Sequence, residues 1–228
     1  MNIQGLQKLT LLDYPGKLAA TVFLGGCNFR CPFCHNADLV LSPSQSGAMT
    51  DEELFSFLDS RRGRLAGVCI SGGEPTLYSE LPSFIYKIKE MGYSVKLDTN
   101  GSSPEMLYAL VADELIDYVA MDIKNSLARY PETVGDPGFD TFAVEESVHY
   151  LLTDSVDYEF RTTVTRELHT AEDMRNIGEW INGAKRYFLQ TYKDSGRILC
   201  PGMSAYSPTE MKELLAAVAP YVKSAEIR

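Results

Sequence analysis

Three cysteines lie within eight residues of this chain, in the order Cys27-x3-Cys31-x2-Cys34. Pro32 interrupts the stretch and disfavours a continuous helix or a central strand, so we expect a loop. Thiolates are soft ligands that suit iron–sulfur clusters, zinc and copper(I). Three of them in one loop fit a cubane cluster that leaves one iron without a protein ligand. They also fit zinc, with His35 or a distant cysteine as the fourth ligand. A disulfide is the poorest interpretation, because three cysteines cannot all pair within the loop.

Length, charge and hydropathy limit the class of protein. The 228 residues contain no long repeat, low-complexity segment or convincing interior linker, so we expect one domain over residues 1–228. The net charge of −10 argues against a nucleic-acid partner, which needs a basic stripe. No apolar run approaches the ~20 residues that span a bilayer, which argues against a membrane protein. The N-terminus lacks the layout of a signal peptide, and clustered thiols favour a reducing compartment, so the cytoplasm is expected.

Strand-like and helix-like patterns alternate along the chain. A short ribbon over residues 3–12 is expected to precede six strands, at 18–24, 67–71, around 95–97, 118–123, 157–164 and 186–191. Amphipathic helices separate them, with capping signals at Thr50, Ser103, Thr170 and Ser207. This alternation predicts βαβ units and a parallel sheet. Six units are too few for a closed eight-stranded barrel, so the prediction is a partial (β/α)6 TIM-like barrel, open on one side. A doubly wound sheet is the second choice.

Polar residues stand where the predicted strands end. The cysteine loop follows the first strand, Gly72-Gly73-Glu74 follows the second, and Asp98 and Asp122 close the third and fourth. Ligands of parallel α/β folds collect at the carboxyl ends of the strands. The glycines could equally form an ordinary turn, and each aspartate could serve a salt bridge or a cap. We interpret the group as a candidate binding pocket.

The fifth predicted strand, 157–164, has two different faces. Glu159, Arg161 and Thr163 share one face, because alternate residues of a strand point the same way. Charged residues on a buried strand need a partner or a ligand. We therefore expect this face to line the interior of the barrel.

The cysteine spacing, with an aromatic residue before the last cysteine, resembles the signature of radical S-adenosylmethionine enzymes. Three flanking segments sharpen the likeness: Asp13-Tyr14-Pro15-Gly16, the run 22–26, and Cys34-His35-Asn36. They are similar to segments of glycyl-radical-enzyme activating proteins, and most similar to those that activate anaerobic ribonucleoside-triphosphate reductase. The resemblance extends roughly from Asp13 to Gln190.

The resemblance implies a set of cofactors and the residues that hold them. Cys27, Cys31 and Cys34 would hold one [4Fe–4S] cluster, whose fourth iron binds S-adenosylmethionine. No catalytic residue is expected beyond these ligands. In some related activases a monovalent cation also binds beside the cofactor. The residues that match the cofactor-binding motifs are Phe33, Gly72, Gly73, Glu74, Asp98, Thr99, Asp122, Lys124 and Arg161.

The implied activity is that of an activase. One electron from flavodoxin or ferredoxin would cleave S-adenosylmethionine, and the resulting radical would take a hydrogen atom from a glycine of a partner glycyl radical enzyme. Lys193 stands where the pyruvate formate-lyase activase has a histidine, which favours anaerobic ribonucleotide reductase as that partner. Cys69 and Cys200 are expected to bind no metal, and His149 and His169 are expected to lie at the surface or in the packed core rather than to act as ligands. The alternatives are a pyruvate formate-lyase-type activase, a radical enzyme that acts on a small molecule, and a zinc-stabilised binding module.

Overall fold

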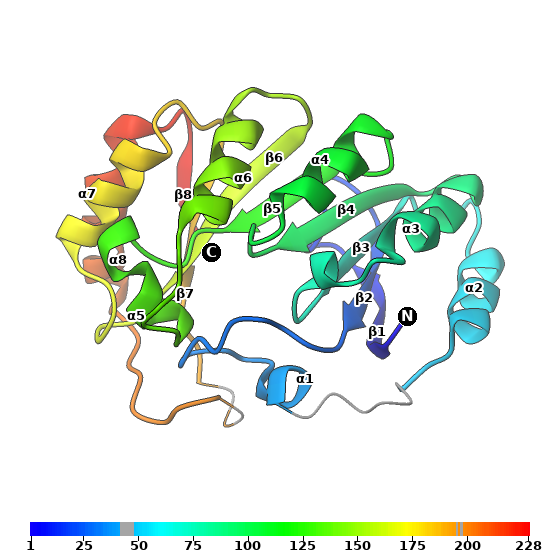
Figure 1. Ribbon diagram of the computed structural model, residues 1–228, viewed down its shortest axis with the longest axis horizontal. Helices are drawn as coiled ribbons and strands as arrows, with labels where there is room; N and C mark the ends of the chain where they lie inside the picture. The colour runs from blue at the N-terminus through cyan, green and yellow to red at the C-terminus, as the bar shows by residue number, and fades with distance from the viewer. Residues whose placement is uncertain (42–47, 195, 197) are drawn as a thin grey trace. The chain divides into compact units, whose positions relative to one another are not determined.

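The computed structural model describes residues 1–41, 48–194, 196 and 198–228. Strands and helices alternate along most of the chain (Figure 1). The strands are β1 Ile3–Thr10, β2 Ala19–Leu24, β3 Gly67–Gly72, β4 Ser94–Thr99, β5 Tyr118–Asp122, β6 Asp157–Val164, β7 Tyr187–Thr191 and β8 Ala225–Ile227. The helices are α1 Ala37–Leu41, α2 Asp51–Ser60, α3 Leu81–Glu90, α4 Pro104–Ala112, α5 Tyr130–Val134, α6 Phe142–Leu152, α7 Ala171–Trp180 and α8 Pro208–Val218, with 3₁₀ turns η1 Pro75–Leu77, η2 Leu127–Arg129 and η3 Ala219–Tyr221.

The fold class is confirmed. The strands follow one another in the sheet in the order of the sequence, with β1 and β8 at its two ends, so the sheet is open. All six predicted strands are present as β2 to β7. The predicted ribbon is β1, which pairs antiparallel with β2. No helix within the described residues is both long and apolar enough to cross a membrane.

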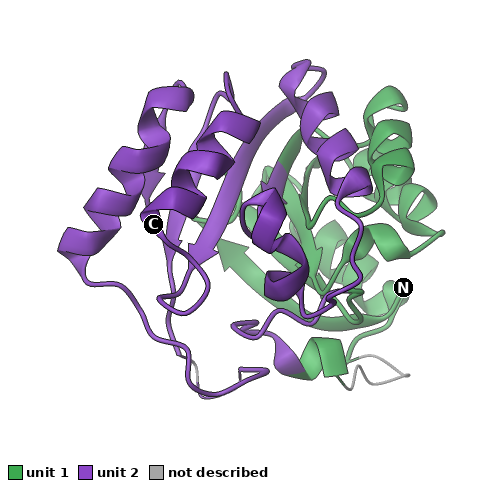
Figure 2. Cartoon of the chain, turned by 60° about the vertical axis from the view of Figure 1, so that its left-hand side comes forward, with its two compact units in different colours: residues 1–28, 38–119 green, residues 29–37, 120–228 purple. Residues whose placement is uncertain are grey.

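The chain divides into two compact units (Figure 2). Unit 1 contains residues 1–28 and 38–119, and unit 2 contains residues 29–37 and 120–228. The chain passes from one unit to the other at three places: between Asn28 and Phe29 in the cysteine loop, between Ala37 and Asp38 in α1, and between Val119 and Ala120 in β5. The expectation of a single domain stays a prediction.

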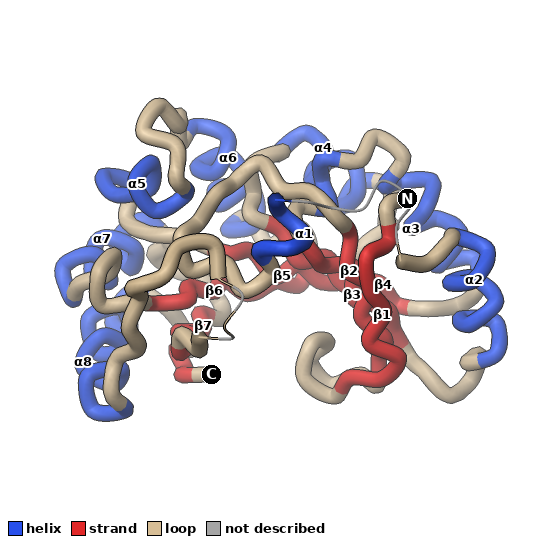
Figure 3. The backbone as a smooth tube through the Cα atoms, turned by 90° about the horizontal axis from the view of Figure 1, so that it is seen from below, coloured by secondary structure: helices blue, strands red, loops and turns tan. Residues whose placement is uncertain are grey.

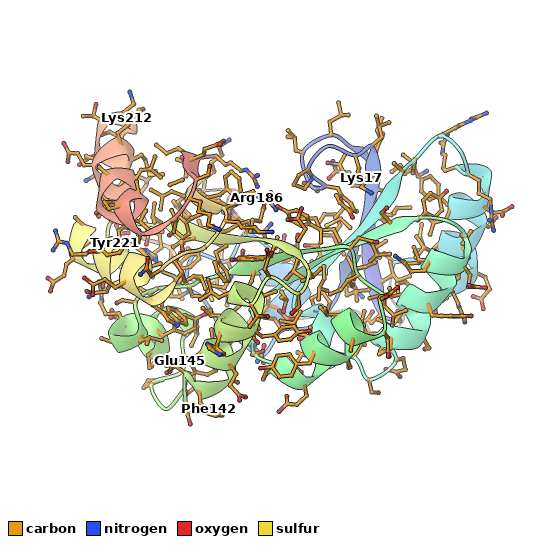
Figure 4. The ribbon with its side chains drawn as sticks, turned by 90° about the horizontal axis from the view of Figure 1, so that it is seen from above. Lys17, Phe142, Glu145, Arg186, Lys212 and Tyr221 are labelled. Atoms are coloured by element: carbon orange, nitrogen blue, oxygen red, sulfur yellow. The ribbon has the colours of Figure 1, made fainter. Side chains whose placement is uncertain are left out.

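Unit 1 is built on parallel pairs of β2 with β3 and β3 with β4. Helices α2, α3 and α4 line the outside of these strands (Figure 3). The predicted apolar stripe of α3 is buried, namely Leu81, Phe84, Ile85 and Ile88. At the opposite end of β2 from the cysteine loop, the Lys17 ammonium donates to Ser94 and lies over the ring of Tyr14, which closes the turn after β1 (Figure 4).

Unit 2 is built on parallel pairs of β6 with β7 and β7 with β8. Helix α7 packs its Gly178 against the Tyr221 ring, and a Cβ at that glycine would come within 2.5 Å of it (Figure 4). The sequence analysis did not predict β8, which has only three residues and no alternation to read. It also missed α1 and α5, which have five residues each and no helical repeat.

The capping signals were correct at three of four positions. Thr50, Thr170 and Ser207 each form a reciprocal capping box with the residue three positions later. Ser103 occupies the N-cap of α4, but its side chain makes no capping hydrogen bond. The backbone explains the difference, because ψ is 74° at Ser103 and 162° at Thr50. The two side chains are therefore oriented differently relative to the first N–H groups of their helices.

Thr50→Ala should therefore destabilise the protein by about 1 kcal/mol, the usual cost of losing an N-cap side chain. Ser103→Ala is the matched control and should change the free energy of unfolding by less than about 0.5 kcal/mol. Urea unfolding of both variants measures this difference. Equal losses would contradict the capping assignment.

Candidate active site

Unit 1 contributes Cys27, which follows β2 through Gly25 and Gly26. The backbone there is held from two sides, because the Gly26 N–H donates to Leu39 O at 2.8 Å and the Tyr78 hydroxyl donates to Gly25 O. The Cys27 thiol is half-buried, and the Asn100 amide lies 3.9 Å from its sulfur. The amide of Asn100 also donates to Asn28, at 2.9 Å.

Two glycines at the end of β3 pack directly on this backbone. A Cβ at Gly72, where φ is +124°, would lie 2.2 Å from Leu24 O, and a Cβ at Gly73 would lie 1.8 Å from Gly26 O. The N–H groups of Gly73 and Glu74 donate to Leu24 O and Gly26 O, both at 2.8 Å. No side chain fits in this space. The glycines are thus needed for contact between two segments of the chain, a reason that the sequence did not reveal.

The Glu74 side chain is almost fully buried and joins two loops. One carboxylate oxygen accepts from the N–H and the hydroxyl of Thr76 and from the Thr99 hydroxyl, and the other accepts from the Asn100 N–H at 2.6 Å. Burial raises the pKa of Glu74, while these four donors counteract that shift. Glu74 therefore positions Asn100, and through it the surroundings of Cys27.

Asp98 has a partner on its own strand. The buried Lys96 ammonium is paired with the Asp98 carboxylate, and it also lies 3.9 Å from the Cys69 sulfur. Lys96 and Asp98 are two residues apart on β4, so both side chains point to one face. Lys96 was not among the predicted site residues, although this spacing signals the pair.

Unit 2 contributes the second part of the cysteine loop, residues 29–37. Cys31 is buried and Cys34 half-buried, and the Cys34 N–H donates to Cys31 O at 3.0 Å. The Phe33 ring packs edge-on against the His169 ring. The Cys200 N–H donates to Pro32 O at 3.0 Å, which places this fourth cysteine beside the loop, with an exposed side chain.

Asp122, Lys124 and Arg161 form one charged group at the ends of β5 and β6. Arg161 Nε and Lys124 Nζ each donate to a different Asp122 oxygen, at 2.9 Å. Burial would raise the pKa of Asp122, but the two cations outweigh burial and lower it to about 2. Burial would lower the pKa of Lys124, but the Asp122 and Cys31 charges raise it. The three side chains together carry two positive charges and one negative charge.

The other charged residues of the predicted interior face are also paired. Both oxygens of the buried Glu159 carboxylate accept from the Arg228 guanidinium, and Thr163 donates to Gln190. His169 is buried, accepts from the Thr165 N–H at Nδ1 and therefore donates from Nε2 to Lys124 O at 2.8 Å. His169 thus holds the backbone of Lys124, a positioning role that no sequence motif announced. His149 and Lys193 are exposed.

The cysteine side chains have the chemistry that an iron–sulfur cluster requires. All five cysteines carry thiols. Cys27, Cys31 and Cys34 lie within eight consecutive residues, a spacing that suits ligation of one cluster by three thiolates. Within residues 1–41, 48–194, 196 and 198–228, no three histidine, cysteine, aspartate or glutamate side chains are already arranged around a metal position. The chemistry of the donors fits, and the ligand assignment stays a prediction.

Gly73→Ala should destabilise the protein by about 1–3 kcal/mol or more, because the added methyl group would overlap Gly26 O. Gly5→Ala is the control in unit 1, since a Cβ there comes no closer than 3.6 Å to another side chain. Urea unfolding of the two variants provides the comparison. A Gly73 variant as stable as the wild type would disprove the close packing.

Acid should remove the stability that Asp122 contributes. Its pKa is 3.8 unfolded and about 2 folded, so the contribution is complete above about pH 4 and is lost as the pH falls toward 2. Urea midpoints across this range should fall less in Asp122→Asn than in the wild type. An exposed α3 carboxylate provides the control, Glu90→Gln, which should follow the wild type.

Comparison with known proteins places these features in a family. The profile of the Radical SAM superfamily matches residues 21–179, more than half of the chain. A Methanocaldococcus jannaschii protein provisionally named a glycyl-radical enzyme activating enzyme is 32% identical over 232 residues, covering 99% of this chain and 95% of its own. A pyruvate formate-lyase-activating enzyme of Clostridium pasteurianum is 35% identical over 108 residues, covering 44% of this chain and 43% of its own.

A solved structure agrees with the fold. Streptococcus suis SuiB bound to S-adenosylmethionine has a TM-score of 0.67 at 16% identity, and the match covers 88% of this chain and 48% of that one. That likeness concerns the fold alone. The family profile and the nearly full-length relative lead to one conclusion: this chain belongs to the radical SAM superfamily of enzymes.

Proposed function

We propose that this protein activates a glycyl radical enzyme by removing a hydrogen atom from a backbone glycine of that partner. The observation that carries the proposal is the match to the Methanocaldococcus jannaschii protein named as a glycyl-radical enzyme activating enzyme. That match extends over nearly the whole chain rather than over the cysteine loop alone. When bound, the cluster and S-adenosylmethionine supply a one-electron cleavage of the cofactor and the radical that attacks the glycine. The protein holds and orients both and excludes water.

Cys27, Cys31 and Cys34 are the proposed cluster ligands. Their spacing supports this assignment, as does the thiol-only character of the set. Cys69 is a poor candidate because it is fully buried in β3 next to Lys96. With two thiols outside the loop, at Cys69 and Cys200, the chain has too few cysteines for a second four-cysteine cluster.

The residues proposed to bind the cofactor fall into two groups. In unit 2, the net positive group of Asp122, Lys124 and Arg161 suits the carboxylate of S-adenosylmethionine, since arginine and lysine are its natural partners. Phe33 offers an apolar surface. In unit 1, the residues proposed to border the cofactor are Gly72, Gly73, Glu74, Asp98 and Thr99.

Two of these assignments are refined by the contacts of the side chains. The Glu74 carboxylate is occupied by four donors, so we assign it a positioning role. Asp98 is balanced by Lys96, and Asp122 by Lys124 and Arg161, so neither needs a metal ion for charge balance. The proposal of a monovalent cation at this site is therefore supported only by the resemblance to the activases.

The proposed partner is anaerobic ribonucleotide reductase, with flavodoxin or ferredoxin as the electron donor. Lys193, at the position of the activase histidine, supports this choice over pyruvate formate-lyase. The local match to a pyruvate formate-lyase-activating enzyme makes pyruvate formate-lyase the second candidate for the partner. A radical enzyme acting on a small molecule remains the alternative outside the activases, and a zinc-bound module the alternative outside catalysis.

The ligand assignment predicts the behaviour of four variants. Replacement of any one of Cys27, Cys31 or Cys34 by alanine should abolish iron binding and cofactor cleavage. Only two cysteine ligands would then remain in the loop, and two are too few to hold the cluster. Cys200→Ala, in the loop that touches Pro32, should keep both. Iron analysis and visible absorbance of anaerobically reconstituted protein measure the cluster. Loss of iron from the Cys200 variant, with iron retained in the Cys31 variant, would contradict the assignment.

The partner assignment predicts an electron paramagnetic resonance signal. Reduced enzyme, S-adenosylmethionine and anaerobic ribonucleotide reductase should together give the doublet of a glycyl radical, and omission of any one should abolish it. A doublet with pyruvate formate-lyase alone would replace the proposed partner and keep the activity. No doublet with either, together with conversion of a small molecule, would refute the activase function.

A further inference from the structure

A lysine is buried in the middle of β4, on the face of the strand that also carries a candidate cofactor residue. The Lys96 side chain is only 1% exposed, and an unpaired ammonium group in such a place would be costly. Its ammonium is paired with the Asp98 carboxylate, two residues further along the same strand. The strand therefore supplies its own positive charge next to Asp98.

The side chains level with Lys96 on the neighbouring strands are a cysteine and a threonine. In the register of unit 1, Lys96 pairs with Cys69 on β3, and Cys69 pairs with Thr21 on β2, so the three lie in one row across the sheet. The ammonium lies 3.9 Å from the Cys69 sulfur, while the Thr21 hydroxyl donates to Asp13. Within the described residues, Asp98 is the only carboxylate that is paired with Lys96.

The oxygen atoms that a bound cation would need in unit 1 are already engaged. Sodium and potassium are hard cations, which bind oxygen ligands. Among the residues proposed to border the cofactor in unit 1, Glu74, Asp98 and Thr99 have side-chain oxygens. Four donors occupy the Glu74 carboxylate, and one of them is the Thr99 hydroxyl, which also accepts from the Gly101 N–H at 3.1 Å. The negative charge of Asp98 is met by Lys96, so these residues do not fit a bound monovalent cation.

We propose that the Lys96 ammonium takes the place of a monovalent cation at Asp98, so that this protein binds no such ion there and needs none for cofactor cleavage. An ammonium group carries the same single positive charge as a sodium or potassium ion, and on a lysine it is a compact point charge. The inference rests on the proposed function, because only the resemblance to the activases implies the cation. Lys96 is a positioning residue, since it acts through Asp98.

The first test compares the stability of the full-length, cluster-containing protein in potassium chloride and in choline chloride, because choline is too large for a potassium site. The wild type should have the same urea midpoint in both salts. Lys96→Met keeps a side chain of similar length without the charge, so its midpoint should be lower, and potassium should raise it above the value in choline. At ten times its dissociation constant, potassium would raise the ratio of folded to unfolded protein about elevenfold.

Two further variants control for salt effects that do not involve Asp98. Lys89→Met removes the ammonium of a more exposed ion pair, with Asp117, and its midpoint should be the same in both salts. A double variant that combines Lys96→Met with Asp98→Asn removes both charges of the buried pair. Its midpoint should also be the same in both salts, because no carboxylate remains there to hold the ion.

The second test measures cofactor cleavage by the wild type in the same two salts, and it does not depend on the folding of any variant. Equal rates are expected. A wild type that needs potassium for stability or cleavage would overturn the inference, as would a Lys96→Met midpoint that is equal in both salts or a matching potassium effect in Lys89→Met. A wild type that cleaves no cofactor in either salt would refute the proposed function, while the urea midpoints still decide the inference.

Discussion

The surroundings of Cys27 depend on the contact between two backbone segments, at Gly73 and Gly26. A Cβ at Gly73 would lie 1.8 Å from Gly26 O, so only glycine allows β3 to end against the residues that lead into the cysteine loop. Two hydrogen bonds of 2.8 Å complete the contact. Glu74 follows at once and fixes Asn100, whose amide reaches the Cys27 sulfur. A contact between segments far apart in the sequence thus determines what surrounds the first cysteine.

Unit 2 surrounds its two loop cysteines by other means. There, charge and aromatic packing replace the close backbone contact. His169 holds the Lys124 carbonyl, and Lys124 and Arg161 together hold Asp122 in its ionised form. The resulting net positive charge lies at the ends of β5 and β6, where we propose that the carboxylate of S-adenosylmethionine binds. Each unit therefore supplies different chemistry, and the chain passes between the two units within the cysteine loop, after Ala37 and within β5.

Much of the fold followed from the sequence, while the site residues stay a prediction. The alternation of strand-like and helix-like patterns predicted the strands β2 to β7, and the rule that ligands bind at strand ends selected Asp98 and Asp122 as candidates. The partners of these residues were harder to foresee. Glu74 and Asn100 are 26 residues apart, and no local pattern announces their bond. His169 lacked a motif because its role depends on tertiary neighbours. The Lys96–Asp98 pair was the exception, since its two-residue spacing on a strand carries the information.

The central claim is that three loop cysteines hold a [4Fe–4S] cluster whose remaining iron binds S-adenosylmethionine. Electron–nuclear double resonance of the reduced protein with S-adenosylmethionine labelled by ¹⁵N at its amino group tests this claim most directly. The account predicts a ¹⁵N coupling strong enough for direct coordination to iron, which disappears with unlabelled cofactor. A cluster signal that is identical with and without the labelled cofactor would contradict the account.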